Sequence, residues 1–235
     1  MKRNSLLRVL LLSLFLLTSC ATGSVQKPQA RGAVPPGARI LLIPPLVHLS
    51  ELTAGGTLEP RADWTATAEK LVVAALDAQL RAKRLVLISY REPDAGTPSR
   101  ETHLQLKKVH GTVGRAILLH AYNPQLQLLN KRGSFDWTLG EEVRIFKEDY
   151  GDADYALFSE FLDAYASGGR IALNVAAAVL GGPIRYGRQV CVASLVDLKT
   201  GDIVWFNHFV DPSGDLRTPE PAHRAVQQLL SELPL

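Results

Sequence analysis

The stretch Arg39-Ile40-Leu41-Leu42-Ile43-Pro44-Pro45 decides the fold class, because it is a short apolar run that ends at two prolines. Runs without polar alternation are typical of strands buried on both faces of an α/β sheet. Over residues 63–80, apolar side chains recur at helical spacing, and residues 85–88 are again wholly apolar. A strand, a helix and a second buried strand predict a βαβ unit, with residues 47–62 as the loop between its first two elements.

A second helix is expected beyond this unit. Thr97-Pro98 places a capping residue before a proline, which is a typical helix start. Asn123-Pro124 would end this helix. Gly111 and Gly114 each weaken a helix by roughly 1 kcal/mol, so we expect a break near its middle.

The remaining patterns complete one domain. They predict a short helix that stops at Gly151, a strand over 154–166, a hairpin over 190–206 with Gly201 in its turn, and a last helix opened by Thr218-Pro219. The sequence therefore predicts a single α/β domain over residues 38–235, with a mixed β-sheet and helices packed on it.

The first residues have the layout of a secretory signal. Lys2, Arg3 and Arg8 precede an apolar run over residues 9–17, and small residues lead to Ser19 and Cys20. The run is shorter than the roughly 20 apolar residues of a membrane-spanning helix. We therefore predict a signal peptide over residues 1–19, cleaved between Ser19 and Cys20. The alternative is an ordinary signal peptide in which the cysteine has no role.

Leu17-Thr18-Ser19-Cys20 resembles the lipobox of bacterial lipoproteins. The resemblance implies that Cys20 carries a diacylglycerol on its sulfur and an acyl group on its new amino terminus, so that the membrane is a partner through this lipid. Ala21, rather than aspartate, implies the outer membrane as destination. Residues 20–37 contain Gly, Ser, Gln, Lys and proline without apolar periodicity, which predicts a flexible tether.

Charge and cysteine content exclude some classes of function. The chain has 26 Lys+Arg and 23 Asp+Glu, and three of the basic residues lie within residues 1–19, which leaves 26 − 3 = 23 against 23. Without a basic excess, no nucleic-acid partner is expected. Cys191 is the only cysteine besides Cys20 and lies in an apolar strand pattern. It is predicted to be a small core residue rather than a nucleophile.

No motif for catalysis or for a cofactor was found. None of the six histidines has zinc-ligand spacing, and nucleophile-elbow, phosphate-loop and dinucleotide fingerprints are missing. His103 and His110 could share a helix face, but we expect them to be solvated side chains. Asp197 is expected to fix the hairpin turn. The sequence predicts no catalytic residue, metal or cofactor, and a protein that is not an enzyme.

An apolar insert over residues 168–188 is the unusual feature. Gly168-Gly169 and Gly181-Gly182 bracket a segment that is apolar nearly all round and too short to span a bilayer. It is expected to dock on a partner protein or a sister subunit, because exposed apolar surface marks interaction sites. The alternative is a helix buried in the core of its own domain. The expected docking residues are Ile171, Leu173, Val175, Val179 and Leu180.

The hairpin sequence Ala193–Trp205 resembles one shared by envelope lipoproteins that include CsgG, the N-terminal domain of TolB and LpoB. The strand Ile40–Pro44 and the segment Gly151–Tyr155 resemble the corresponding parts of this group. The resemblance implies an α/β fold used for assembly and partner binding. It favours a lipid-anchored periplasmic accessory or scaffold protein of an envelope assembly or export system, bound to the outer membrane. An activator of a cell-wall synthase, as LpoB is, is the alternative, and a periplasmic hydrolase a distant one.

Overall fold

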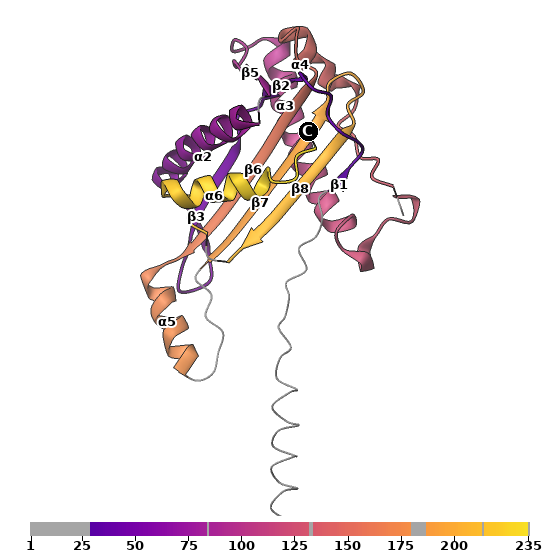
Figure 1. Cartoon of the computed structure of the whole chain (residues 1–235). Helices are drawn as coiled ribbons and strands as arrows, with labels where there is room; N and C mark the ends of the chain where they lie inside the picture. The colour runs from indigo at the N-terminus through magenta and orange to yellow at the C-terminus, as the bar shows by residue number, and fades with distance from the viewer. Residues whose placement is uncertain (1–28, 84, 132–133, 180–186, 213, 235) are drawn as a thin grey trace, which may run out of the picture.

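A mixed β-sheet forms the centre of the protein, with helices on both of its faces (Figure 1). The computed structural model describes residues 29–83, 85–131, 134–179, 187–212 and 214–234. The predicted signal peptide and Cys20 therefore lie outside the described residues. The α/β class and the single mixed sheet are confirmed.

Eight strands are described: β1 (Gln29–Ala30), β2 (Arg39–Leu42), β3 (Leu46–Leu52), β4 (Leu58–Pro60), β5 (Val86–Ser89), β6 (Tyr155–Ala166), β7 (Gly187–Asp197) and β8 (Ile203–Asp211). The α-helices in the described ranges are α2 (Ala62–Ala82), α3 (Pro98–His120), α4 (Arg144–Asp149), α5 (Gly168–Val179) and α6 (Pro219–Leu229). Short 3-10 turns lie at Pro124–Leu126, Leu129–Lys131 and Glu141–Val143. None of these described helices combines the length and the hydropathy that crossing a membrane requires.

The strand order is β1-β8-β7-β6-β2-β5. β2 is parallel to both β5 and β6, whereas β7 is antiparallel to both β6 and β8. After β2, Pro44-Pro45 interrupts the chain, which then continues as β3 along the same edge of β6. The predicted loop over residues 47–62 is therefore wrong. The segment contains most of β3 and all of β4. In β3, Val47 and Leu49 point into the core while Leu46 and His48 point outwards, as the alternation of a strand requires.

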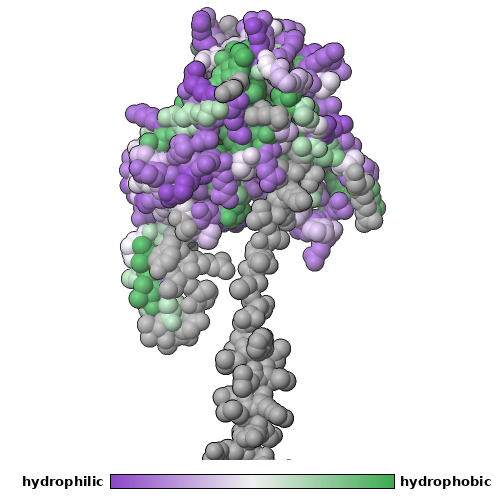
Figure 2. Space-filling view, viewed as in Figure 1, coloured by the Kyte–Doolittle hydropathy of each residue, from purple (hydrophilic) through white to green (hydrophobic). Residues whose placement is uncertain are grey.

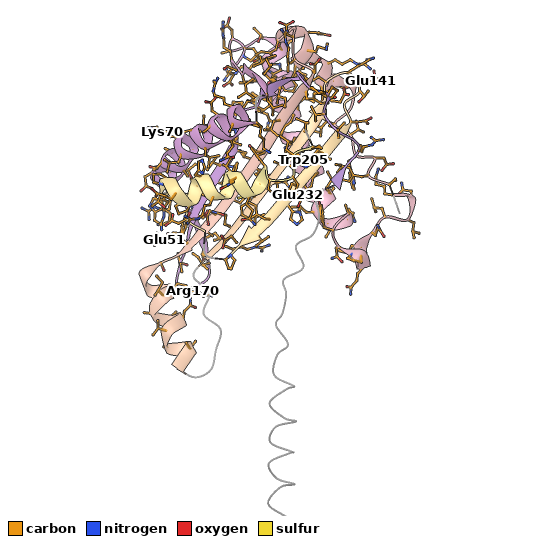
Figure 3. All side chains as sticks on the ribbon, viewed as in Figure 1. Glu51, Lys70, Glu141, Arg170, Trp205 and Glu232 are labelled. Carbon is orange, nitrogen blue, oxygen red and sulfur yellow. The ribbon has the colours of Figure 1, made fainter. Side chains whose placement is uncertain are left out.

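Each face of the sheet carries its own core. On one face, α2 and α6 cover β6 and β7, and most of the apolar positions of both helices are buried there. Trp205 of β8 is fully buried in this core (Figure 3). α3 and α4 cover the other face, where Phe146, Phe158 and Phe206 meet. The sheet is thus the middle layer of three.

The expected break in the second helix does not occur. α3 is continuous from Pro98 to His120, and Thr97 caps it by accepting a hydrogen bond from the backbone N–H of Arg100. Gly111 and Gly114 are buried against the sheet. Packing of this face onto the core outweighs the low helix propensity of two glycines, since tertiary contacts supply most helical stability in proteins.

Two parts of the chain, β5 and the predicted tether, differ from expectation. The second strand of the βαβ unit, β5, is parallel to β2 as predicted, but it lies at the sheet edge with Val86 exposed rather than buried on both faces. In the predicted tether, residues 29–37 belong to the domain. Gln29–Ala30 pairs with β8, the N–H of Val34 donates to the carbonyl of Pro234, and the Val34 side chain is buried.

The hairpin between β7 and β8 turns as predicted. Gly201 has a φ of 80°, and the Asp197 carboxylate accepts hydrogen bonds from the N–H groups of Lys199 and Thr200. The turn also contacts the segment before α4, because the Gly201 carbonyl accepts from the N–H of Leu139 and the hydroxyl of Thr138. A Cβ atom on Gly201 would lie 2.1 Å from the carbonyl oxygen of Gly140.

Two glycine-to-alanine substitutions should change stability in opposite directions. Gly114→Ala should raise the free energy of unfolding by about 1 kcal/mol, because the new Cβ would lie 3.9 Å from Phe206, an ordinary contact, and the helix propensity improves. Gly201→Ala should lower it by more than about 1 kcal/mol, since it adds a backbone clash to an unfavourable φ. Urea unfolding of both variants measures this. Gly56→Ala, with a φ of 87° and no atom near its Cβ, is the control for φ alone; a Gly201→Ala loss no larger than the control would contradict the clash.

Candidate interaction surface

Helix α5 lies beyond one end of the sheet, in the connection between β6 and β7 (Figure 1). Its start is attached to the turn between β3 and β4. The N–H of Ser167 donates to the carbonyl of Leu52, and Arg170 donates through its Nη1 to the carbonyl of Ala54. Figure 3 shows Arg170 at this point of attachment. The remainder of the helix extends away from the body of the domain.

The apolar side chains of α5 face outwards. Ile171 is 39% exposed, Leu173 53% and Val175 51%, whereas the polar Asn174 is buried. The space-filling view shows the resulting hydrophobic surface along the helix (Figure 2). The alternative of a helix tucked into its own core is therefore wrong for these three side chains. Val179 ends the helix, and Leu180 lies outside the described residues. Docking by the five predicted residues stays a prediction.

A second apolar surface lies on the sheet itself, on the face that α3 covers. Leu162 of β6 pairs with Val190 of β7, which pairs with Val210 of β8, so the three side chains stand in one row across the sheet. Leu46 of β3 lies on the same face one row away, opposite Glu160. Leu46, Leu162 and Val210 are 45%, 38% and 52% exposed. We call these four apolar residues (Leu46, Leu162, Val190 and Val210) the sheet row.

Polar groups border the sheet row towards α3. Glu160 is buried, and the loss of water around its carboxyl raises the pKa, while the positive charges of Arg115 and His48 lower it by a smaller amount. His48 pairs with Leu162 across β3 and β6. An apolar centre with a charged border is the usual composition of a protein–protein interface.

His103 and His110 are buried, contrary to the interpretation as solvated side chains. The Nε2 atom of His110 lies 2.6 Å from the hydroxyl oxygen of Ser194, and its ring stacks on Phe158 with centroids 4.5 Å apart. His103 contacts the hydroxyl of Tyr90 and lies 3.0 Å from a carboxylate oxygen of Asp149. Both histidines stand on the α3 face that packs on the sheet, and a helical wheel places them with Leu106 and Ile117.

The His110–Ser194 pair has the residue types of a nucleophile and its base, but it is sealed between α3 and the sheet. Ser194 is fully buried, and the glycines Gly111 and Gly114 bring the helix against the strands beside it. Desolvation lowers the pKa of His110 to about 4, so the ring is neutral at pH 7. This pair therefore acts as a buried hydrogen bond that fixes α3 on the sheet.

A second buried polar cluster, which no sequence motif indicates, holds the segment before α6. Asp163 of β6 accepts hydrogen bonds from the hydroxyl of Tyr165 and from Gln189, and the N–H of Leu216 donates to the Tyr165 oxygen. Burial raises the pKa of Asp163, and these hydrogen bonds lower it by less. The guanidinium of Arg217 lies 3.8 Å from the centre of the Tyr165 ring. Alternation along β6 could have indicated that Asp163 points inwards.

Other candidate sites have structural explanations. Cys191 is buried, and burial raises the pKa of its thiol, as expected of a core residue. In the described ranges, no three metal-binding side chains gather closely enough to hold an ion. The described lining of the hollow beside Trp137 contains His120 but no carboxylate. A second hollow contains Asp154 and Asp197 but no histidine among its described lining residues.

The chain matches no protein-family model and no curated protein sequence. Solved structures do resemble it. A PelC dodecamer from Paraburkholderia phytofirmans has 13% identity and a TM-score of 0.39, covering 89% of this chain and 98% of that one. Lipoprotein GNA1162 from Neisseria meningitidis has 13% identity and a TM-score of 0.31, covering 74% and 81%. The LpoB C-terminal domain from Salmonella enterica has 15% identity and a TM-score of 0.28, covering 77% and 84%.

The Neisseria meningitidis protein is described as a lipoprotein.

The buried histidine makes a prediction for pH dependence. The unfolded chain protonates His110 near pH 6.5, whereas the folded protein resists protonation down to about pH 4. Its contribution to stability is therefore complete above pH 6.5 and is lost as the pH falls towards 4. We expect the free energy of unfolding to drop by a few kcal/mol more in the native protein than in His110→Gln over this window, since each pKa unit corresponds to about 1.4 kcal/mol.

Urea unfolding between pH 7 and pH 4 measures this difference. Glu160 and Asp163 have raised pKa values and titrate with the opposite sign, but they are present in both proteins and cancel in the comparison. His223→Gln, which removes an exposed histidine on α6, is the matched control. Equal pH dependence in the native protein and His110→Gln would show that His110 is not held neutral by the fold.

Proposed function

We propose that this protein is a lipid-anchored accessory protein of the bacterial cell envelope that acts by contact with another protein and not by catalysis. The sheet row carries the proposal. Leu46, Leu162 and Val210 are large apolar side chains on an ordered sheet, and no described element covers them. Apolar residues that gather in this way on a soluble domain mark interaction sites.

The anchor completes the proposal. The lipobox-like sequence that ends at Cys20 would attach the protein to the outer membrane, with the domain in the periplasm. The chain after residue 19 is formally neutral, so it has no excess of positive charge that would attract a nucleic acid. The buried His110–Ser194 pair and the buried Asp163 cluster both serve the packing of the fold. Among the described residues, no observation favours the synthase-activator or the hydrolase alternative.

A lipidation experiment tests the anchor. Expressed with its signal sequence in a Gram-negative host, the protein should be recovered in the outer-membrane fraction, and mass spectrometry should show acyl groups on Cys20. Cys20→Ala should prevent both the cleavage and the acylation, because the sulfur is the attachment atom. A cleaved protein that begins at residue 20 without acyl groups would contradict the anchor.

Crosslinking tests the contact surface. A photoreactive phenylalanine analogue at Leu162 should crosslink in intact cells to an envelope protein or a second copy of this chain, identified by mass spectrometry. The same analogue at Leu129, an exposed leucine outside the sheet row, is the matched control. Replacing Val210 by Asp should lower the yield of the Leu162 crosslink at least several-fold while the melting temperature stays within a few degrees, because this side chain is already half exposed. Equal crosslinking from Leu129 and Leu162 would rule out the sheet row as the contact.

A further inference from the structure

The end of the sheet that carries α5 is built from several strand ends. β6 finishes there and β7 begins there, since Tyr165 pairs with Gly187. β8 finishes at the same end, where Asp211 pairs with Gln189 of β7. β3, parallel to β6, also ends there, because Leu52 pairs with Ala166. The turn between β3 and β4 and the helix α5 are therefore neighbours at this end.

The first described strand shows from which side the chain enters the domain. β1 is antiparallel to β8, with Gln29 opposite Phe206 and Ala30 opposite Trp205. β8 runs towards the α5 end of the sheet, so β1 runs away from it. The chain therefore enters β1 from the α5 end.

The length of chain between Cys20 and β1 limits the distance between the membrane and the sheet. Cys20 and Gln29 are 29 − 20 = 9 residues apart. Even fully extended at about 3.4 Å per residue, nine residues span only about 30 Å. Phe206 lies 211 − 206 = 5 residues before the end of β8. Five residues of strand are about 17 Å, so a chain running towards this end reaches only about 13 Å beyond the sheet.

Helix α5 is long enough to cover this distance. Its 12 residues make a helix of about 18 Å. If Cys20 carries a lipid, a bilayer within about 13 Å of this sheet end is therefore within reach of α5. A short tether that enters from the α5 end also orients this end of the domain towards the membrane.

The chemistry of this end suits a lipid surface. Gly168–Val179 contains no acidic residue, and its single charged side chain is Arg170. The neighbouring turn, residues 53–57, is uncharged. Ile171 and Val175 are exposed on one side of the helix and Leu173 is exposed on the opposite side, while the polar Asn174 is buried, so apolar side chains meet solvent on both sides of α5. Interfacial helices place apolar side chains at the boundary between headgroups and acyl chains and avoid negative charge near anionic lipids.

We propose that α5 reaches the bilayer to which Cys20 is anchored and forms a second, non-covalent contact with the membrane. This proposal rests on the lipid anchor proposed above. The helix would hold the α5 end of the domain against the lipid, and the sheet row, on a lateral face of the sheet, would remain accessible to a protein partner.

The test uses the mature, lipidated protein reconstituted into vesicles of phosphatidylethanolamine and phosphatidylglycerol. An environment-sensitive fluorophore is attached at Leu173→Cys, or at Lys70→Cys on α2 as the control (Figure 3). Cys191 is buried and Cys20 is acylated, so neither competes for the label. Lipids with a spin label on the acyl chain should quench the probe at residue 173 several-fold more than the probe at residue 70.

A variant separates the helix contact from the anchor. In Leu173→Asp/Val175→Asp, with the probe at Ala172→Cys, quenching should fall to the level of the Lys70 control, while the protein still floats with the vesicles through its lipid. Both changed side chains are half exposed, so circular dichroism should show an unchanged fold.

The outcomes are distinguishable. Flotation without quenching at residue 173 would overturn the membrane contact of α5 and leave the lipid anchor standing. Quenching that appears only after envelope proteins are added would also overturn it, in favour of a protein partner on α5. Failure of the protein to carry acyl groups or to float would overturn the anchor and, with it, the inference that depends on it.

Discussion

The structure depends on the burial of β6 on both of its faces. This strand is paired with β2 over residues 155–157 and with β3 over residues 160–166 along one edge, and with β7 over residues 155–165 along the other. Its alternate side chains enter different cores, with Leu157 and Phe161 beneath α2 and α6, and Ala156 and Phe158 beneath α3. Unpairing β6 would expose both cores at once. The two cores therefore unfold together, and the domain is one cooperative unit.

The C-terminal half of β6 also carries an exposed apolar side chain and a buried polar cluster. Towards its C-terminal end, α3 no longer covers the face of Phe158, and Leu162 becomes exposed in the same row as Val190 and Val210. On the opposite face, Asp163 and Tyr165 replace apolar contacts with a buried hydrogen-bond cluster that fixes the segment before α6. β6 then continues into α5. One half of the strand thus builds the domain, and the other half presents the surfaces on which the proposed function and the proposed membrane contact depend.

Most elements could be predicted from local patterns, and the errors have physical causes. The loop prediction for residues 47–62 failed because Leu46 and His48 point outwards while Val47 and Leu49 point inwards, which gives β3 a weak pattern beside a glycine-rich turn. The expected break at Gly111 and Gly114 failed because helix propensity is outweighed when the face that carries the glycines packs on a sheet. The prediction that His103 and His110 are solvated is wrong because their shared helix face, which also carries Leu106, is the face of α3 that packs on the sheet.

The sequence by itself determined the α/β class, the hairpin with Gly201 in its turn, the buried faces of α2 and α6, and the apolar composition of residues 171–180, because periodicity and turn chemistry act over a few neighbouring residues. Only the tertiary structure decided that Leu162, Val190 and Val210 stand in one row across three strands, that β1 enters from the α5 end, and that Ile171, Leu173 and Val175 are exposed while Asn174 is buried. Each of these depends on which strand pairs with which and where a covering helix ends. Such contacts join residues far apart in the chain, and no local pattern encodes them.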